Sequence, residues 1–159
     1  MYDVDFKLST VFFVTCAIFP LQNDSFVKNV RASIGVLEKC FQDHKIEEVS
    51  VAFNGGKDNI AMIHLVHAFL QNRFPNWNGH LEALYILEKE PFREVEDFIE
   101  EAKDNYGLEL TKIERPMKTA LGTFLKDRPH IKAMLLATRK GKNFFSRAVY
   151  YCLYELLHL

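Results

Sequence analysis

Cysteine is scarce and scattered in this chain of 159 residues. Cys16, Cys40 and Cys152 are odd in number, lie far apart and form no C-x-x-C pair. This spacing argues against a disulfide framework and against a zinc site, and it is typical of a reducing compartment. We therefore expect a cytoplasmic protein, with a mitochondrial location as the alternative.

The chain also lacks an excess of either charge. Twenty Lys and Arg residues face 21 Asp and Glu residues, for a formal net charge of −1. This balance gives no electrostatic case for a nucleic-acid partner or an anionic membrane. Internal repeats and low-complexity tracts are missing as well, and the length suits one α/β domain.

No apolar run is long enough to span a bilayer comfortably. The mostly apolar run near the N-terminus, residues 8–19 (LSTVFFVTCAIF), has twelve residues, whereas a spanning helix needs about 20. A secretory signal should begin with positive residues, but Asp3 and Asp5 precede this run with only Lys7 as a base. A buried strand or helix is expected here, and a cleaved or membrane-associated leader is the alternative.

Two common nucleotide-binding motifs are absent. A Walker A loop needs G-x-x-x-x-G-K followed by Ser or Thr, but here Gly55 and Gly56 are adjacent and Asp58 follows Lys57. A Rossmann fingerprint needs three spaced glycines after the first strand, and only these two are present.

What the chain does have is an apolar strand that ends in two glycines and leads into a helix. The run is VSVAFNGGKDN, residues 49–59. Backbone N–H groups and a helix N-terminus then face one point, which favours an anion such as a phosphate. Lys57 adds a positive charge, and Asp58 adds a carboxylate that could hold a metal. The alternative is an ordinary Gly-Gly turn between a strand and a helix.

Hydrophobic periodicity predicts alternating strands and helices along the rest of the chain. Strands are expected over 48–53, 83–87, 108–113 and 131–137, and helices over 26–41, 60–70, 91–106 and 117–124. Gly107 is expected to stop the third of these helices. A buried stripe is predicted on the third helix, made by Phe92, Val95, Phe98, Ile99 and Ala102. The alternation predicts a mostly parallel sheet with helices on both faces, with ligands outside the carboxyl ends of the strands.

The FNGGKD string of residues 53–58 is accompanied by further segments in a set order, at 63–68, 84–86, 91–95, 106–108, 117–122 and 137–139. Together these segments resemble the eukaryotic FAD synthases, or FMN adenylyltransferases, of the phosphoadenylyl sulfate reductase-like family. The resemblance runs from about Asp24 to Arg139, roughly three-quarters of the chain. It implies a three-layer α/β fold of the adenine nucleotide α-hydrolase-like type.

The resemblance also implies a reaction and a site. FMN and ATP, with Mg²⁺, would give FAD and pyrophosphate. Asn54, Asp58 and Arg139 would serve catalysis, and Asp58 would hold the metal or anchor the loop. Gly55 and Gly56 would present N–H groups to the phosphates, and Asn54 would donate to a phosphate oxygen. The strand end at Tyr85 and Ile86 would border the adenine, and Arg139 would face the flavin or its phosphate. The implied binding set is Phe53, Asn54, Gly55, Gly56, Lys57, Asp58, Tyr85, Ile86, Thr138 and Arg139.

The likeness stops near residue 140. Lys142, Asn143 and Phe144 stand where the family has Asp, Pro and Tyr, and Ala137 stands where Gly is usual. The chain is therefore divided into an apolar segment (1–22), a nucleotide-binding α/β domain (23–140) and an apolar C-terminal helix (141–159). The last part could drive self-association. The alternative function is a nucleotide-binding module of the same fold without turnover.

Other functions are less well supported by the residues. A sulfonucleotide reductase needs a nucleophilic cysteine near the C-terminus, and Cys152 lacks the surrounding motif. An ATP pyrophosphatase acting on tRNA often uses a basic surface and paired cysteines, which are absent. His64 and His67 share a helix face but no third metal ligand has suitable spacing, so packing is expected there rather than a metal.

Overall fold

The computed structural model describes residues 25–87, 92–139 and 147–151. Helices alternate with strands over most of this range, as the periodicity predicts. The helices are α2 (Ser25–Asp43), α3 (Lys57–Arg73), α4 (Arg93–Tyr106) and α5 (Met117–Asp127). The strands are β1 (Val49–Ala52), β2 (Leu81–Ile86), β3 (Leu108–Ile113), β4 (Ala133–Arg139) and β5 (Arg147–Tyr151), and a short 3₁₀ turn covers Ile46–Glu48.

The strands form one sheet in the order β3-β2-β1-β4-β5. The first four are parallel, and β5 pairs with β4 in the antiparallel direction. In register, Val51 of β1 lies beside Ala83 of β2 and Leu135 of β4. The predicted mostly parallel sheet is confirmed, and β1 is its central strand.

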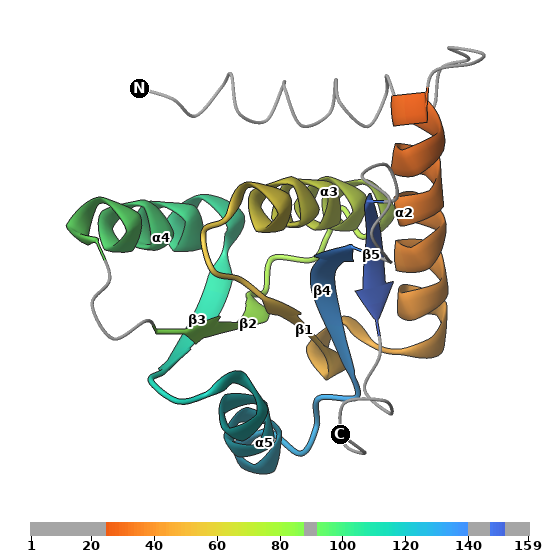
Figure 1. Cartoon of the computed structure of the whole chain (residues 1–159). Helices are drawn as coiled ribbons and strands as arrows, with labels where there is room; N and C mark the ends of the chain where they lie inside the picture. The colour runs from red at the N-terminus through yellow and green to blue at the C-terminus, as the bar shows by residue number, and fades with distance from the viewer. Residues whose placement is uncertain (1–24, 88–91, 140–146, 152–159) are drawn as a thin grey trace.

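Helices cover both faces of the sheet, so the molecule has three layers (Figure 1). α3 and α4 lie on one face and α5 on the other, while α2 stands beside β5. The larger core lies under α2, α3 and α4, and the smaller one lies between α5 and the sheet. Fully buried strand residues such as Val49, Val51 and Ala83 explain why these strands read as continuous apolar runs.

The α4 helix ends at a glycine in the left-handed conformation, as the sequence predicts. Gly107 has φ 61° and ψ 51°, and its N–H donates to the Lys103 carbonyl.

Gly107→Ala should cost about 1 kcal/mol of unfolding free energy, because a Cβ disfavours positive φ. Gly35→Ala is the matched control: Gly35 lies within α2 with open space around it, and alanine there should stabilise the protein by about 0.5–1 kcal/mol. Urea unfolding of both variants tests the difference in sign.

The helix predicted for residues 141–159 is wrong over Arg147–Tyr151, which form the strand β5. Ala-Val-Tyr-Tyr has β-branched and aromatic side chains that suit a strand when an edge is available. β4 provides that edge, with Ala137 opposite Val149. The remaining residues of this tail and the apolar segment 1–22 lie outside the described residues, as does Pro91.

The buried stripe predicted on α4 is only partly present. Ile99 and Ala102 are buried, but Phe92, Val95 and Phe98 are 76%, 37% and 37% exposed. The apolar period indicated correctly which side of the helix faces the protein. It could not show which positions on that side are covered by other described residues. Within the described part of the chain, none of the helices has both the length and the apolar character needed to cross a bilayer.

Candidate functional site

The glycine loop lies at the carboxyl end of the central strand, between β1 and α3. Phe53 continues β1, with its N–H donating to the Leu84 carbonyl at 2.9 Å, and its side chain is only 1% exposed. Gly55 has φ 72°, a conformation that other residues rarely adopt. The Gly56 N–H donates to Asn54 Oδ1 at 3.0 Å, which closes a tight Asx-type turn. The turn holds the loop in one shape before any ligand binds.

This turn bears on two sequence-based expectations. The Gly56 amide is expected to face a phosphate, but here it has an internal partner in Asn54. The Asn54 side chain is expected to donate to a phosphate oxygen, and the turn is compatible with that role because it uses only Oδ1, whereas the amide nitrogen is the donor. Asn54 itself is exposed, so this nitrogen is accessible.

The α3 helix begins directly after the loop. Gly56 is its N-cap and supplies no side-chain hydrogen bond to the first turn. The carbonyl of Gly56 accepts from the Ile60 N–H at 3.0 Å, which starts the helical ladder. Lys57 is exposed and Asp58 is half-buried, both in the first turn. The first-turn amides and the positive end of the helix dipole therefore lie beside an exposed lysine, and this combination favours an anion.

The other predicted site residues lie at the same edge of the sheet. Tyr85 and Ile86 end β2, which is parallel to β1, and the Phe53–Leu84 hydrogen bond brings the loop alongside them. Thr138 and Arg139 end β4, on the other side of β1. Three parallel strands from distant parts of the sequence thus end around one loop.

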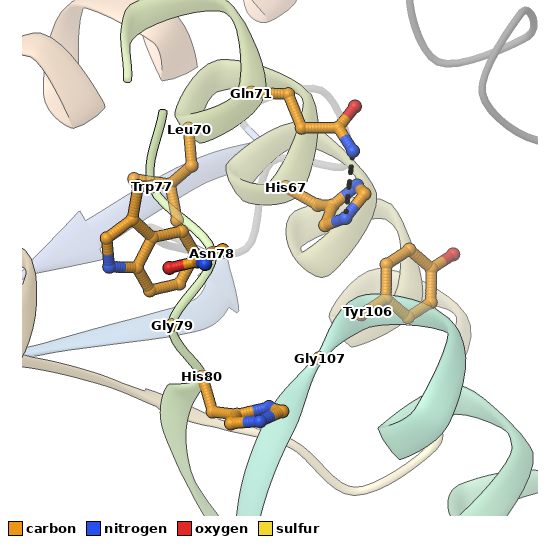
Figure 2. A pocket seen from close by; sticks show the side chains of 9 residues that line it. All are labelled: His67, Leu70, Gln71, Trp77, Asn78, Gly79, His80, Tyr106 and Gly107. Atoms are coloured by element: carbon orange, nitrogen blue, oxygen red, sulfur yellow. Dashed lines mark hydrogen bonds between the residues drawn. The ribbon is translucent and has the colours of Figure 1, made fainter. Parts of the chain in front are cut away.

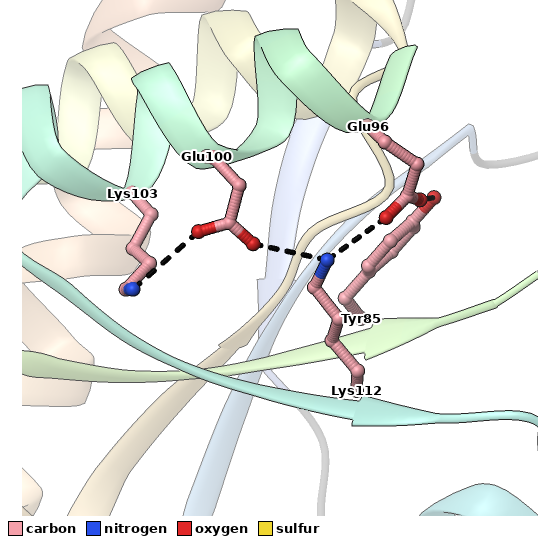
Figure 3. A network of polar contacts seen from close by, with 5 residues as sticks. All are labelled: Tyr85, Glu96, Glu100, Lys103 and Lys112. Atoms are coloured by element: carbon pink, nitrogen blue, oxygen red, sulfur yellow. Dashed lines mark hydrogen bonds and ion pairs between the residues drawn. The ribbon is translucent and has the colours of Figure 1, made fainter. Parts of the chain in front are cut away.

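A polar network joins α4 to β2 and β3 near this edge, and the sequence patterns did not reveal it (Figure 3). Lys112 Nζ of β3 donates to Glu96 Oε2 at 2.8 Å and lies 3.0 Å from Glu100 Oε1. The Tyr85 hydroxyl of β2 donates to Glu96 Oε1 at 2.7 Å. Lys103 Nζ contacts the other Glu100 oxygen at 3.4 Å. Lys112 and Glu96 lie 16 positions apart in the sequence, and Tyr85 and Glu96 lie 11 apart, so no local spacing signals these contacts.

The network should make stability depend on pH at both extremes. Hydrogen bonds from Lys112 and then Tyr85 lower the pKa of Glu96, and that from Lys112 lowers the pKa of Glu100. Hydrogen bonds to both carboxylates raise the pKa of Lys112. The carboxylate contribution is present above the ordinary pKa of 4.5 and is lost as pH falls through the lower folded values. The lysine contribution is present below 10.5 and is lost as pH rises through its higher folded value.

We therefore expect the unfolding free-energy difference between the wild type and Lys112→Met to stay constant between about pH 6 and 9 and to shrink below about pH 4.5. Denaturant unfolding across this range measures it. If the free-energy difference between the two proteins is as large at pH 3 as at pH 7, the charges of Lys112 and its partners do not account for the stabilisation.

A separate pocket lies at the opposite end of the sheet (Figure 2). It has a volume of about 240 Å³ and is formed where α3 and α4 end and β2 and β3 begin. His67, Trp77, His80 and Tyr106 contribute its rings. Ligands of parallel sheets bind at the carboxyl ends of the strands, and this pocket lies at the opposite ends.

The two histidines of α3 pack around Tyr106, as expected. His64 Nδ1 lies 2.8 Å from the Tyr106 hydroxyl, and both imidazoles meet that ring edge to face. Burial lowers the pKa of His64. Over the ranges that the structure describes, no three His, Cys, Asp or Glu residues gather as a metal site would require.

The reactivity of the thiols bears on the sulfonucleotide reductase alternative. Cys40 is fully buried, and burial followed by the nearby Asp43 charge raises its pKa to about 12. A thiol of that pKa is not a nucleophile at neutral pH. Cys152 lies outside the described residues.

Comparison with known proteins agrees with this geometry. Residues 48–131, just over half of the chain, match the family model of the phosphoadenosine phosphosulfate reductase domain. The chain belongs to this family. The matched region begins one residue before β1 and ends just before β4, so it includes the whole glycine loop. The family and fold expected from the sequence are therefore confirmed.

The chain is also similar to individual proteins whose names refer to flavin nucleotides. The chain is 30% identical over 112 residues to a probable FAD synthase of Schizosaccharomyces pombe, an alignment that covers 68% of this chain and 42% of that protein. Candida glabrata FMN adenylyltransferase in complex with FMN and the ATP analog AMPCPP has a TM-score of 0.71 at 21% identity, covering 95% of this chain and 59% of that one. The same enzyme with FAD and inorganic pyrophosphate has a TM-score of 0.68 at 22% identity, covering 82% and 49%.

These likenesses differ in what they establish. At about one identical residue in five, the solved structures show that the fold is shared. The chain spans less than half the length of the S. pombe relative. The range matched by the family model contains the loop, α3, β1 and β2.

Proposed function

We propose that this chain carries the nucleotide-binding part of an FMN adenylyltransferase and transfers AMP from ATP to FMN, with FAD and pyrophosphate as products. The observation that carries the proposal is the FNGGKD loop, which joins the central β1 strand to the N-terminus of α3. The likeness to a probable FAD synthase and to an adenylyltransferase with FMN and an ATP analog supports the choice of substrates.

In the proposed site the β- and γ-phosphates lie at the start of α3. The first-turn amides of the helix and Lys57 would bind them, and the amide nitrogen of Asn54 would add a neutral donor. The Asx-type turn of Asn54 and Gly56 supports this role because it fixes the loop backbone in advance. Such preorganised donors stabilise charge without rearranging during the reaction.

The other proposed roles belong to residues at or next to the ends of β1, β2 and β4. The end of β2 at Tyr85 and Ile86 would border the adenine through its backbone, and Phe53 would support the loop from the core. Thr138 and Arg139 at the end of β4 would lie toward the flavin phosphate. Arg139 is charged at every physiological pH, so it suits a phosphate whose oxygen becomes the nucleophile.

Magnesium is proposed as the metal that accompanies ATP. Asp58 is the one acidic residue in the first turn of α3, and it is half-buried beside the loop. Mg²⁺ is usually bound by one or two carboxylates together with substrate phosphates and waters, so a single aspartate fits better than a closed protein site would. When bound, Mg²⁺ neutralises charge on the phosphates.

The reaction then needs mainly positioning and charge neutralisation. An oxygen of the FMN phosphate forms a bond to the α-phosphorus of ATP. The bond from that phosphorus to the bridging oxygen of the β-phosphate breaks, and pyrophosphate leaves with the electron pair. Lys57 and the α3 amides would stabilise the charge that develops on this leaving group.

The test is to incubate the purified chain with FMN and Mg-ATP and to follow FAD and pyrophosphate together. Equal amounts of both products support the proposal. ATP binding by titration calorimetry without FAD formation would instead support a nucleotide-binding module without turnover. No binding of ATP would overturn the proposed site.

Two smaller proposals accompany this function. The free, buried thiol of Cys40 supports a reducing compartment, which is the cytoplasm or the mitochondrial matrix. Self-association through the apolar C-terminal tail is also proposed, and light scattering at several concentrations tests it.

A further inference from the structure

The α4 helix lies beside the glycine loop. A Cβ placed on Gly55 would lie 3.4 Å from Ile99 Cδ1 and 3.7 Å from Val95 Cγ1. These are van der Waals distances, so the side chains of Ile99 and Val95 close off the space next to the Gly55 Cα. A shift of this helix by a fraction of an ångström would therefore change the space that confines Gly55.

Apolar packing alone fixes α4 weakly. Of its described residues only Ile99 and Ala102 are buried, and the large apolar side chains of its first turns are substantially exposed. The strand beneath it, β3, is the edge strand of the sheet. The polar network of Figure 3 supplies further attachment of α4 to the sheet, because it joins this helix to both β2 and β3.

Lys112 is the centre of that network. Its ammonium group lies between two carboxylates one helical turn apart, Glu96 and Glu100, and 5.8 Å from the centre of the Tyr85 ring. Its side chain is 32% exposed, and that of Glu96 is 25% exposed. Because Lys112 contacts two residues on the same face of α4, it restrains both the distance of this helix from the sheet and its rotation about its own axis. The Tyr85 hydrogen bond to Glu96 adds a third point of attachment.

We infer that Lys112 is a positioning residue for the glycine loop. By binding Glu96 and Glu100 it keeps Val95 and Ile99 of α4 next to Gly55. The inference rests on the proposed function only for the consequence that the loop binds ATP. The mechanical link from Lys112 to the loop is a property of the ligand-free protein. It can therefore be tested with and without a nucleotide.

Lys112→Met is the main variant, and Lys103→Met is its control. Both remove one positive charge, and both residues contact Glu100, but Lys103 joins α4 only to itself. A general loss of attraction for the anionic ATP would affect both variants. Lys112→Arg should restore the wild-type behaviour. Tyr85→Phe removes the hydroxyl bond to Glu96 without a change of charge, and it serves if Lys112→Met does not fold.

Without nucleotide, amide hydrogen exchange should reveal the link. The amides of Gly56 and Ile60 are hydrogen-bonded in the loop and at the start of α3, so their exchange reports the loop conformation. We expect them to exchange about five to ten times faster in Lys112→Met, with amides of α5 on the opposite face unchanged. Lys103→Met should match the wild type. A uniform increase over the whole protein, or unchanged loop amides, would overturn the inference.

With nucleotide, titration calorimetry should show ATP affinity about fivefold to tenfold lower in Lys112→Met, and FMN affinity within about twofold of the wild type. Tyr85→Phe should move ATP affinity in the same direction by a smaller factor. If the wild type does not bind ATP, the proposed function fails, while the exchange experiment still decides the role of Lys112. If the wild type binds ATP and Lys112→Met binds it equally well, the positioning role fails alone.

Discussion

Gly56→Asp should lower ATP affinity by about a hundredfold while leaving the protein folded. A carboxylate at this position would lie within a few ångströms of the proposed phosphate site, where like charges repel by about 4 kcal/mol at an effective dielectric constant of 20. About 2.7 kcal/mol of this suffices for a hundredfold loss. Titration calorimetry with Mg-ATP measures the change directly.

The fold should tolerate this substitution. Gly56 has φ −66° and ψ 150°, which any residue adopts, and it is the N-cap of α3. Aspartate is a favoured N-cap residue, so the free energy of unfolding should be unchanged or slightly higher. The new Cβ would lie 3.0 Å from Asn54 Oδ1, and this exposed side chain can move by the few tenths of an ångström required.

Gly56→Asn is the matched control. It adds nearly the same volume and the same capping ability, but no charge. We expect its loss of ATP affinity to be about tenfold or less, because only crowding remains. Equal losses in both variants would mean that volume rather than charge matters. Wild-type ATP affinity in a folded Gly56→Asp variant would show that the phosphates do not bind at this loop.

Phe53→Ala should have the largest effect on stability, a loss of about 3–5 kcal/mol. The side chain is 1% exposed and belongs to the larger core, so its removal leaves a cavity directly beneath the glycine loop. Many domains of this size are stable by only about 5–15 kcal/mol. Urea unfolding at pH 7 measures the loss.

Phe92→Ala removes the same atoms from a residue that is 76% exposed. It should change the unfolding free energy by about 0.5 kcal/mol or less. Phe53→Leu keeps most of the buried volume and should cost about 1–1.5 kcal/mol. Similar losses for Phe53→Ala and Phe92→Ala would contradict the placement of Phe53 in the core.

The central part of the fold was predictable because its signals are local. Buried parallel strands read as continuous apolar runs, and residues 83–86 of β2 belong to such a run, predicted over 83–87. Gly107 was recognised as a helix stop because positive φ is expensive for other residues. The loop was recognised because a strand, two glycines and a helix start occupy consecutive positions. Its location at a strand end then followed from the parallel topology.

The turn within the loop was not predictable in the same way. The Gly56 amide donates to Asn54 Oδ1 rather than facing outward. An asparagine two residues before a glycine permits such a turn, but these residue types do not by themselves fix the backbone angles that bring the amide and Oδ1 together.

The errors concern features that depend on what lies opposite a segment. Arg147–Tyr151 has helical potential by itself, but pairing with β4 makes it a strand. Phe92 falls on the apolar side of α4, yet the described residues leave it 76% exposed. Periodicity describes one element and contains no information on its neighbour.

By itself the sequence determined the order of strands and helices, the parallel sheet and the glycine loop at the end of β1, because each is encoded by residues adjacent in the chain. Only the tertiary structure decided that Lys112 of β3 meets Glu96 and Glu100 of α4, and that α4 in turn meets Gly55. Those contacts join separate elements, and their strength depends on distance and burial, which exist only once the elements have packed together.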